Sequence, residues 1–274
     1  MSSVTHCNLN PRYISTISEQ FFSNKKSVRP LAIITYGPTG SGKSVVLKSF
    51  LKTNETKYTS DDFIEINIDS LVEAINHYKT NVSTALDDET RTKIYFSCRE
   101  EVDELSSLLF YKAIANKNNL IYETTGSSVK WLKGDLQKLR ESGYIIVVIY
   151  PFVTWNILNK RLTDRERTSV RKIDRTLLKT NVGNAIKNFF DVIPSSDYAY
   201  IYDNTGSAMD VMPIIISYDG TISHNKFKPK ITCNSKELSK ILSTEDDREI
   251  LNLFQKYFIA NACGASSVLQ SNLY

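Results

Sequence analysis

One short stretch early in the chain has the residue types and spacing needed to hold phosphate groups. It matches the pattern G-x-x-x-x-G-K-[ST] and reads Gly37, Pro38, Thr39, Gly40, Ser41, Gly42, Lys43, Ser44. In such a loop the glycines let successive backbone N–H groups turn inward around phosphate oxygens. Lys43 would reach the β and γ phosphates of ATP, and Ser44 would bind Mg²⁺. The alternative is a glycine-rich turn with no chemical role.

The elements on either side of this loop favour the chemical interpretation. Leu31–Tyr36 is a short apolar run of the kind found in buried strands, and 45–51 has the composition of a helix. The N-terminus of that helix would direct its partial positive charge at the same phosphates. A strand, a glycine loop and a helix in this order predict a nucleotide-binding turn.

Strands and helices alternate along most of the chain, which predicts a parallel sheet flanked by helices. The fold class expected is α/β, a P-loop kinase-type fold with a mostly parallel five-stranded sheet. Beyond the first strand, strands are predicted at 63–68, 120–124, 144–150 and 198–202. Helices are predicted at 11–22, from Ser70 to 75, at 92–116, from 126 to 139, at 155–162, and in a segment that reaches 190.

The last part of the chain has a different pattern. Residues 213–218, the pair Asp219-Gly220 and residues 221–224 have the sequence of a β-hairpin with a type I′ turn. Helices are expected at 235–242 and 244–258. We therefore expect a kinase domain at 1–210, with a leading helix, and a hairpin-and-helix extension at 211–274 that packs on the same domain.

Composition and charge exclude several classes of protein. Lys and Arg exceed Asp and Glu by 34 to 30 and are dispersed, so a dedicated nucleic-acid binder is not indicated. The four cysteines form no CxxC pair, and with three histidines they suggest no metal site. They are interpreted as reduced thiols of a cytoplasmic protein. Met1–Asn10 is polar, and the longest apolar run, 144–153, is too short to span a bilayer.

Among P-loop proteins, the missing motifs leave the small kinases. A GTPase would carry Asn-Lys-x-Asp, and neither 116–119 nor 159–162 supplies the aspartate. Motor ATPases place acidic residues after an apolar strand, whereas the strongest apolar run here ends Tyr150-Pro151-Phe152. A small kinase needs polar groups at the carboxyl ends of neighbouring strands to hold its acceptor.

Two such strand ends carry candidate acceptor residues. Asp69 is expected to end the second strand, and Glu123 with Thr125 the third, so all three should face the crevice above the loop. Asp69 could accept a hydroxyl proton or orient the attacking oxygen. The alternative for Asp69 is a helix cap, a role that Ser70 and Glu73 are expected to fill; for Glu123 it is a solvated strand end.

A run of arginines after the fourth strand suggests a lid over the transferred phosphate. Its members are Arg161, Arg165, Arg167, Arg171 and Arg175. The alternative is a solvated helix in which Arg161 pairs with Asp164 and Arg171 with Asp174, at about 0.2–0.5 kcal/mol per pair.

The order of these motifs resembles the zeta toxin family of P-loop kinases, relatives of chloramphenicol phosphotransferase, from about Leu31 to Asn204. The matching positions are Gly37–Ser44, Ile68-Asp69, Glu123-x-Thr125-Gly126, Pro151, and Arg161 followed by Arg171. The resemblance implies that Asp69 is the base toward the acceptor hydroxyl. It also implies that Glu123 and Thr125 contact the acceptor, and that Arg161 and Arg171 hold ATP phosphates.

The resemblance further implies a nucleotide sugar such as UDP-N-acetylglucosamine as the small-molecule hydroxyl acceptor. The chain departs from the family at two acceptor positions. Ser127 stands where the toxins have an arginine, and Ser107, with Glu104 one turn earlier, stands where they have a glutamate. The expected function is transfer of the ATP γ-phosphate to a hydroxyl, with Lys43 and Mg²⁺ offsetting charge.

Two other functions remain open from the sequence. A kinase for nucleic-acid 5′-hydroxyl ends would use basic residues beside the crevice, for which the candidates are Lys130, Lys133, Lys138 and Arg140. A catalytically degenerate module would bind ATP for stability and use the C-terminal extension to bind a protein partner.

Overall fold

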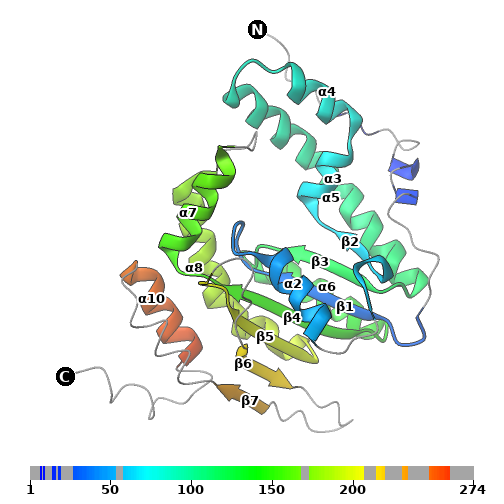
Figure 1. The fold of residues 1–274 in the computed structure, drawn as a ribbon. Coiled ribbons are helices and arrows are strands. Elements are labelled where there is room, and N and C mark those ends of the chain that lie inside the picture. Colours follow the sequence, from blue (N-terminus) through cyan, green and yellow to red (C-terminus); the bar gives the residue numbers. More distant parts are fainter. Residues whose placement is uncertain are drawn as a thin grey trace.

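The fold is organised around one sheet, whose strands follow the order β2-β3-β1-β4-β5-β6-β7 (Figure 1). The structure is a computed structural model. It describes residues 7, 9, 14–16, 18–19, 27–53, 58–167, 173–206, 214–219, 230–233 and 247–259. No helix in these ranges is long and apolar enough to cross a membrane.

Five strands of the sheet are parallel, which confirms the predicted α/β fold. They are β1 (Leu31–Tyr36), β2 (Ile64–Ile66), β3 (Leu120–Thr124), β4 (Ile145–Phe152) and β5 (Tyr198–Asp203). The central strand β1 pairs with β3 on one side and β4 on the other. These two pairings align Thr35 with Glu123 and with Ile149, so the carboxyl ends of the three strands meet at one edge.

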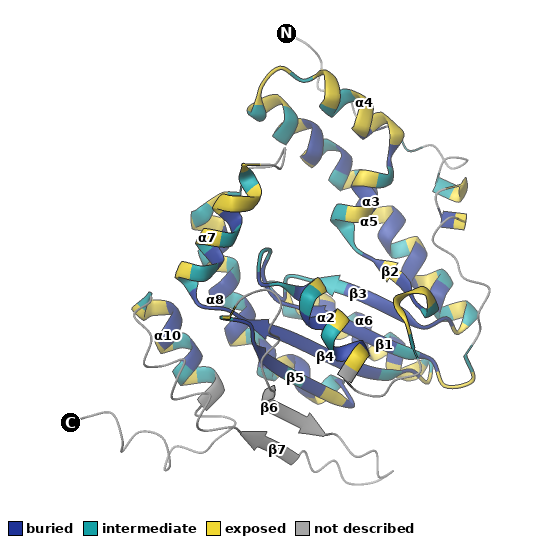
Figure 2. Cartoon of the chain, in the orientation of Figure 1, coloured by how far each residue is buried: buried dark blue, intermediate teal, exposed yellow. Residues whose placement is uncertain are grey.

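Helices cover both faces of the sheet, and burial is concentrated where they meet it (Figure 2). On one face α2 (Lys43–Thr53) packs Val46 and Phe50 against the sheet. The other face carries the larger core, built mainly from helices: α3 (Ile68–Ala74), α5 (Asp88–Asn116), α6 (Val129–Glu141), α7 (Trp155–Glu166) and α8 (Arg175–Val192). The helix α4 (Asn76–Thr84) contributes Tyr78 to this core and is otherwise largely exposed.

The helix after β2 begins earlier than the sequence predicts, at Ile68 rather than Ser70. Asn67 is the N-cap of α3, because its side-chain oxygen accepts a hydrogen bond from the Ser70 amide at 3.2 Å. The expected capping by Ser70 and Glu73 is therefore wrong, and Asp69 lies in the first turn of α3 rather than at a strand end. In the same way α5 starts at Asp88, capped by Asp87, and not at Thr92.

The predicted hairpin is also different. The strand β6 (Ile214–Asp219) pairs antiparallel with β5, and its return strand is β7 (Lys230–Cys233). Asp219 lies opposite Lys230, which excludes a two-residue Asp-Gly turn. The strand expected at 221–224 lies outside the described residues. The bounds of β6 and β7 therefore follow their pairing within the sheet and not the local turn signal.

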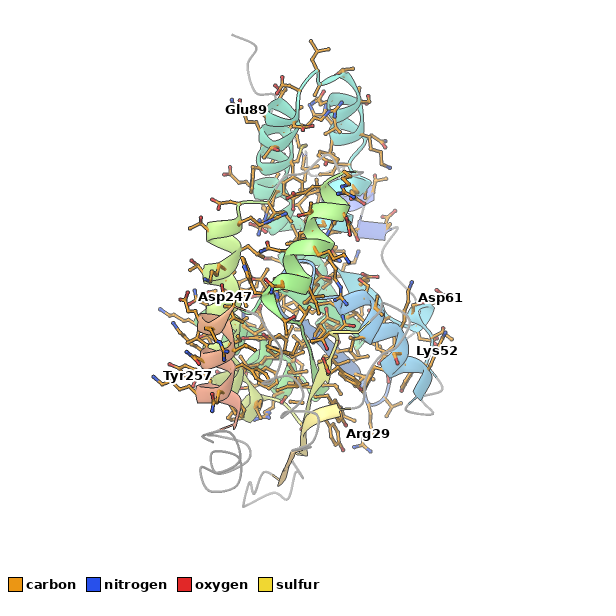
Figure 3. The ribbon with its side chains drawn as sticks, turned by 60° about the vertical axis from the view of Figure 1, so that its left-hand side comes forward. Arg29, Lys52, Asp61, Glu89, Asp247 and Tyr257 are labelled. Carbon is orange, nitrogen blue, oxygen red and sulfur yellow. A yellow bond between two sulfur atoms is a disulfide. The ribbon has the colours of Figure 1, made fainter. Side chains whose placement is uncertain are left out.

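The C-terminal helix packs back onto the large core. It consists of α10 (Arg248–Phe254) and a π-helical turn (Gln255–Ile259), which overlaps the predicted 244–258 and ends one residue later. Phe254 stacks on Phe152 of β4 with ring centroids 4.0 Å apart. Asp247 and Tyr257 mark this element in Figure 3. The helix expected at 235–242 lies outside the described residues, as does most of the one at 11–22, where 14–16 and 18–19 are helical.

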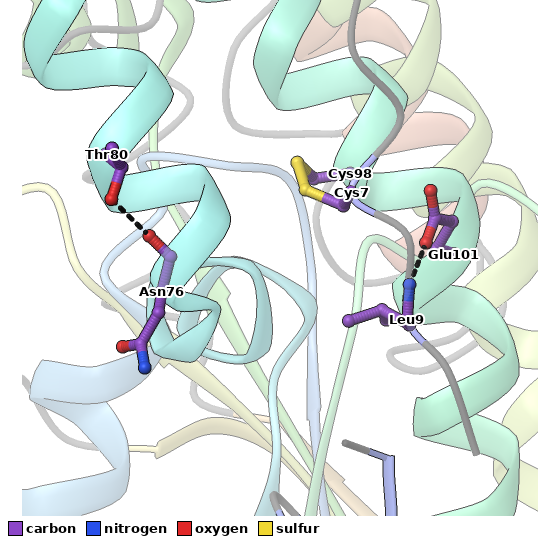
Figure 4. The surroundings of a disulfide bond; sticks show 6 residues. All are labelled: Cys7, Leu9, Asn76, Thr80, Cys98 and Glu101. Atoms are coloured by element: carbon purple, nitrogen blue, oxygen red, sulfur yellow. Dashed lines mark hydrogen bonds between the residues drawn. A yellow bond between two sulfur atoms is a disulfide. The ribbon is translucent and has the colours of Figure 1, made fainter. Parts of the chain in front are cut away.

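A disulfide joins the N-terminal segment to the middle of the chain, so the expectation of reduced thiols is wrong for this pair. Cys7 is bonded to Cys98 of α5, and both are buried (Figure 4). Two residues on, the Leu9 amide donates to Oε2 of Glu101 at 2.7 Å. Both contacts fix the segment along α5. The side chains of Cys233 and Cys263 lie outside the described residues.

Candidate active site

The phosphate loop occupies the turn between β1 and α2, as predicted. Gly37, Gly40 and Gly42 have φ angles of 132°, 85° and 88°, which residues other than glycine rarely adopt. The Gly37 amide donates to the Thr124 carbonyl at 3.0 Å, which ties the start of the loop to the end of β3. The helix α2 begins at Lys43, so the amides of its first turn point back toward the loop.

Lys43 lies at the mouth of the loop and joins it to β3. Its ammonium donates to the carbonyls of Gly37 and Pro38 at 2.9 and 3.1 Å and lies 3.3 Å from Oε1 of Glu123. The side chain is only 6% exposed. A buried cation is thus held between the loop and a carboxylate, at the position expected for contact with a terminal phosphate.

Glu123 is held from a second direction by the N-cap of α3. Asn67 donates from Nδ2 to Oε2 of Glu123 at 2.9 Å. Glu123 therefore links the phosphate loop to the turn that carries Asp69, which lies two residues after Asn67. The structure brings Lys43 and Glu123 together and places Asp69 on the adjoining turn.

The loop after β3 is fixed by α8. Thr125 and Ser127 share a hydrogen bond between their hydroxyls at 2.9 Å. Asn188 of α8 donates from Nδ2 to the carbonyls of Gly126 and Ser127 at 3.2 and 3.3 Å. Thr125 is thus placed on a rigid turn beside the phosphate loop.

Tyr36 supports this turn from the end of β1. Its hydroxyl lies 2.8 Å from the Ala185 carbonyl of α8 and 3.1 Å from that of Gly126. Burial, with smaller contributions from Tyr150 and Asp191, raises the pKa of Tyr36 well above its usual value, so the phenol is neutral. Gly126 has a φ of 73°, and a Cβ there would lie 2.2 Å from the Tyr36 ring, so only glycine fits.

Asp69 is held by residues from two different helices. The Tyr95 hydroxyl of α5 donates to Oδ1, and Nη2 of Arg165, in the last turn of α7, lies 3.9 Å from Oδ2. The carboxylate remains 29% exposed. The sequence identified Asp69 but neither of these as its partners.

Arg161 lies over the phosphate loop. Its Nη2 donates to the carbonyls of Asn204 and Gly206 at 2.8 and 3.0 Å, and Nη1 would lie 3.7 Å from a Cβ at Gly42. Within the described residues Nη1 is buried and has no hydrogen-bond partner. Burial lowers the pKa of this guanidinium. Arg161 thus directs an unpaired donor at the loop and does not pair with Asp164.

Asn204, directly after β5, closes the loop from the same side. Its Nδ2 donates to the Ser41 carbonyl at 2.6 Å, and the residue is 1% exposed. Sequence reasoning missed it as a site residue, although it follows the carboxyl end of a parallel strand, as Asn67 does after β2. That shared position is a signal that could have identified both.

The other arginines of the predicted lid have separate roles. Arg175 forms a bidentate ion pair with Glu166 at 3.0 and 2.9 Å, which joins α7 to α8. Arg167 pairs with Asp164 at 3.2 Å on the surface, and Asp174 caps α8. Arg171 lies outside the described residues. The structure therefore places one predicted arginine, Arg161, at the loop.

The residues present fit a nucleotide with its magnesium ion. The loop supplies three glycines in left-handed geometry, an adjacent lysine and the unpaired buried donor of Arg161, all suited to an anion. Ser44 is exposed in the first turn of α2, where its hydroxyl is open to a ligand. In the described part of the chain no group of three or more His, Cys, Asp or Glu residues forms a metal site by itself. A metal here would thus depend on phosphate oxygens for most of its ligands.

Comparison with known proteins identifies the family. A family profile described as Zeta toxin matches residues 15–209. The chain belongs to the Zeta toxin family. A curated relative, the uncharacterized protein L872 of Acanthamoeba polyphaga mimivirus, is 32% identical over 44% of this chain and 44% of its own length. The chain thus matches less than half of that curated relative.

Solved structures share the zeta toxin fold. The PezAT chromosomal toxin–antitoxin system of Streptococcus pneumoniae gives a TM-score of 0.59 at 14% identity, over 93% of this chain and 97% of the other. A native AvrRxo1-ORF1:-ORF2 complex gives 0.60 at 13% identity, over 91% and 81%. The same complex with ATP gives 0.52 at 11% identity, over 94% and 92%. At these identities the likeness concerns the fold alone.

Proposed function

We propose that the protein is an ATP-dependent kinase that transfers the γ-phosphate of ATP to a hydroxyl group of a small acceptor. The observation that carries the proposal is the contact between Lys43 and Glu123 at 3.3 Å, because it joins the phosphate loop to one of the proposed acceptor residues. Asn67 extends this link to the turn of Asp69. Phosphoryl transfer requires mainly such positioning and charge stabilisation.

Each residue then has a role that its position supports. The loop residues 37–44 would hold the ATP phosphates, with Lys43 and Arg161 offsetting charge on the transferred group, and Arg171 is proposed as a second such arginine. Ser44 would be a ligand of Mg²⁺, which when bound bridges the phosphates and offsets their charge. The relative solved with ATP supports the choice of nucleotide.

The acceptor side is assigned to the other wall of the crevice. Asp69 would orient the acceptor hydroxyl and accept its proton, while Glu123 and Thr125 contact the rest of the acceptor. UDP-N-acetylglucosamine is the first compound to test. The Thr125–Ser127 hydrogen bond occupies the turn where the zeta toxins have an arginine, so the two acceptor sites differ in charge.

A protein partner is part of the proposal. Relatives of this fold occur as the AvrRxo1-ORF1:-ORF2 complex and in the PezAT toxin–antitoxin system. The surface proposed for a partner here is the extension after residue 210, of which β6, β7 and α10 are described.

Nucleic-acid ends are a weaker choice of acceptor. The four basic candidates follow one another along α6, which begins directly after the turn that carries Thr125 and Ser127. Lys130 and Arg140 are ten residues apart, about 15 Å along a helix. Arg140 donates to the Pro194 carbonyl near the start of β5, at the opposite edge of the sheet from the phosphate loop. These residues therefore do not form one basic groove at the site.

The test is label transfer from [γ-³²P]ATP to a deproteinised metabolite extract and, separately, to UDP-N-acetylglucosamine. Asp69→Asn should retain ATP binding while transfer falls by about 10²–10⁴-fold, and Lys43→Ala should abolish transfer. Asp61→Asn is the matched control, because Asp61 is an exposed aspartate before β2 (Figure 3) and its change should have no effect. ATP binding without any labelled product would instead favour the degenerate module.

A further inference from the structure

We propose that Tyr95 is a positioning residue for Asp69, one that holds the carboxylate in the orientation that phosphoryl transfer needs. The inference rests on the proposed kinase function and adds a residue that the sequence motifs do not include. Its basis is the hydrogen bond from the Tyr95 hydroxyl to Oδ1 of Asp69. The two residues are 26 positions apart, on α5 and α3.

Tyr95 is suited to this role because its own position is fixed. The residue is 4% exposed and lies edge-on to Tyr78 of α4 and Phe96 of α5, with ring centroids 6.4 and 5.4 Å away. A buried ring packed in this way has little freedom to turn, so its hydroxyl has a fixed position next to Asp69. Against a carboxylate the hydroxyl can only donate, and it therefore fixes the rotation of Asp69.

The second oxygen of Asp69 faces a much weaker partner. Arg165 reaches Oδ2 from α7 at 3.9 Å, and its side chain is 47% exposed. Exposed ion pairs of this kind contribute little, so an acceptor hydroxyl can replace Arg165 at small cost. The two oxygens of the carboxylate thus differ: a buried phenol holds Oδ1, and Oδ2 lies on the side of the exposed Arg165, where the acceptor hydroxyl is proposed to bind.

A purely structural role for Tyr95 makes a different prediction. In that case its hydroxyl would only help α5 to pack on α3, and removing it would lower stability whatever residue stood at position 69. If Tyr95 acts through Asp69, the effect on transfer depends on the Asp69 carboxylate, and the two changes are not additive. The coupling between the two residues is therefore the decisive measurement.

The experiment uses Tyr95→Phe, which keeps the ring and removes one oxygen atom. Label transfer from [γ-³²P]ATP to the metabolite extract should fall by about ten- to a hundredfold, while the ATP dissociation constant and the extract dilution that gives half-maximal transfer stay the same. Tyr111→Phe is the matched control, since Tyr111 lies on the same helix, is exposed, and contacts Lys138 rather than the crevice. This control should transfer at the wild-type rate.

The double variant separates the possible outcomes. In an Asp69→Asn background, Tyr95→Phe should cause no further loss of transfer. An equal additional loss in that background, or full transfer by Tyr95→Phe alone, would overturn the positioning role while leaving the kinase proposal intact. A wild-type protein that labels no product would remove the proposed function, and the positioning role with it.

Discussion

The two sides of the proposed active site are built in different ways. The phosphate loop is made by consecutive residues whose glycine geometry is local. Within the described residues it contacts the ends of neighbouring strands and α7. The proposed acceptor wall is assembled from Asn67, Asp69, Tyr95 and Glu123, which come from three separate segments and are joined by side-chain hydrogen bonds. The nucleotide side is therefore specified by a motif, and the acceptor side by tertiary structure.

This difference indicates where substitutions should act. Changes in the loop should alter ATP binding through backbone geometry, whereas changes in the wall should alter acceptor use through the packing of α5. The disulfide and the glycines allow this division to be tested without removing any catalytic group.

The largest effect is expected from loss of the disulfide that fixes the N-terminal segment to α5. Cys98→Ala opens a loop of 91 residues and should lower the free energy of unfolding by about 2–5 kcal/mol. Denaturant unfolding of both proteins with and without dithiothreitol provides the check. Reduction should lower the stability of the wild type and leave that of the variant unchanged. Equal sensitivity of both proteins to dithiothreitol would contradict the assignment.

The disulfide variant also tests the division between the two walls. Well below its unfolding temperature, Cys98→Ala should retain the wild-type ATP dissociation constant, because the contacts of Cys7 and Leu9 are with α5 and not with the phosphate loop. Acceptor use should weaken, since Tyr95 lies one turn from Cys98 on α5. If Cys98→Ala weakened ATP binding and left acceptor use unchanged, the proposed division between the two walls would be wrong.

A smaller effect is expected from Gly42→Ala in the loop. The new Cβ would lie 2.2 Å from Nδ2 of Asn204, which is buried and hydrogen-bonded to Ser41. Displacing Asn204 should weaken ATP binding by about a hundredfold, measured by titration calorimetry. Gly143→Ala is the matched control, because Gly143 also has a positive φ, of 77°, but nothing within 4 Å of its Cβ position. Equal losses in both variants would assign the effect to backbone strain alone.

The smallest effect is expected on α6, which belongs to neither wall. Gly134 lies inside this helix with nothing within 4 Å of a Cβ. Gly134→Ala should stabilise the protein by about 0.5–1 kcal/mol, because alanine has less conformational freedom to lose on folding. Thermal unfolding provides the measurement, and ATP binding and transfer should both be unchanged. A decrease in stability would show that the helix tolerates no side chain there.

Local motifs account for what the sequence could predict. The phosphate loop, the five parallel strands and the family follow from residues whose roles depend on near neighbours in sequence. Glu123 was identified by the same reasoning, because its place at the end of β3 follows from the strand itself. Asn67 and Asn204 could also be predicted from the sequence, because each is a polar residue directly after the end of a strand.

Long-range pairing explains what the sequence could not predict. No local signal connects Tyr95 to Asp69, or Cys7 to Cys98, because each pair is joined only when α5 packs against the rest of the wall. At the C-terminal edge, Asp219-Gly220 is a strong hairpin signal, yet the strand that pairs with β6 begins at Lys230. The predicted two-residue turn is therefore wrong, because the bounds of β7 depend on which residues pair with β6 and not on the local turn signal.

The helix α8 has a consequence for protein engineering. It meets α7 through Arg175, the end of β1 through Ala185, and the turn after β3 through Asn188. An attempt to change the acceptor by redesign would do best to vary α3 and α5 and to leave α8 untouched, since one misplaced turn there would disturb both substrates at once. This helix is the part of the scaffold that a directed-evolution library should keep constant.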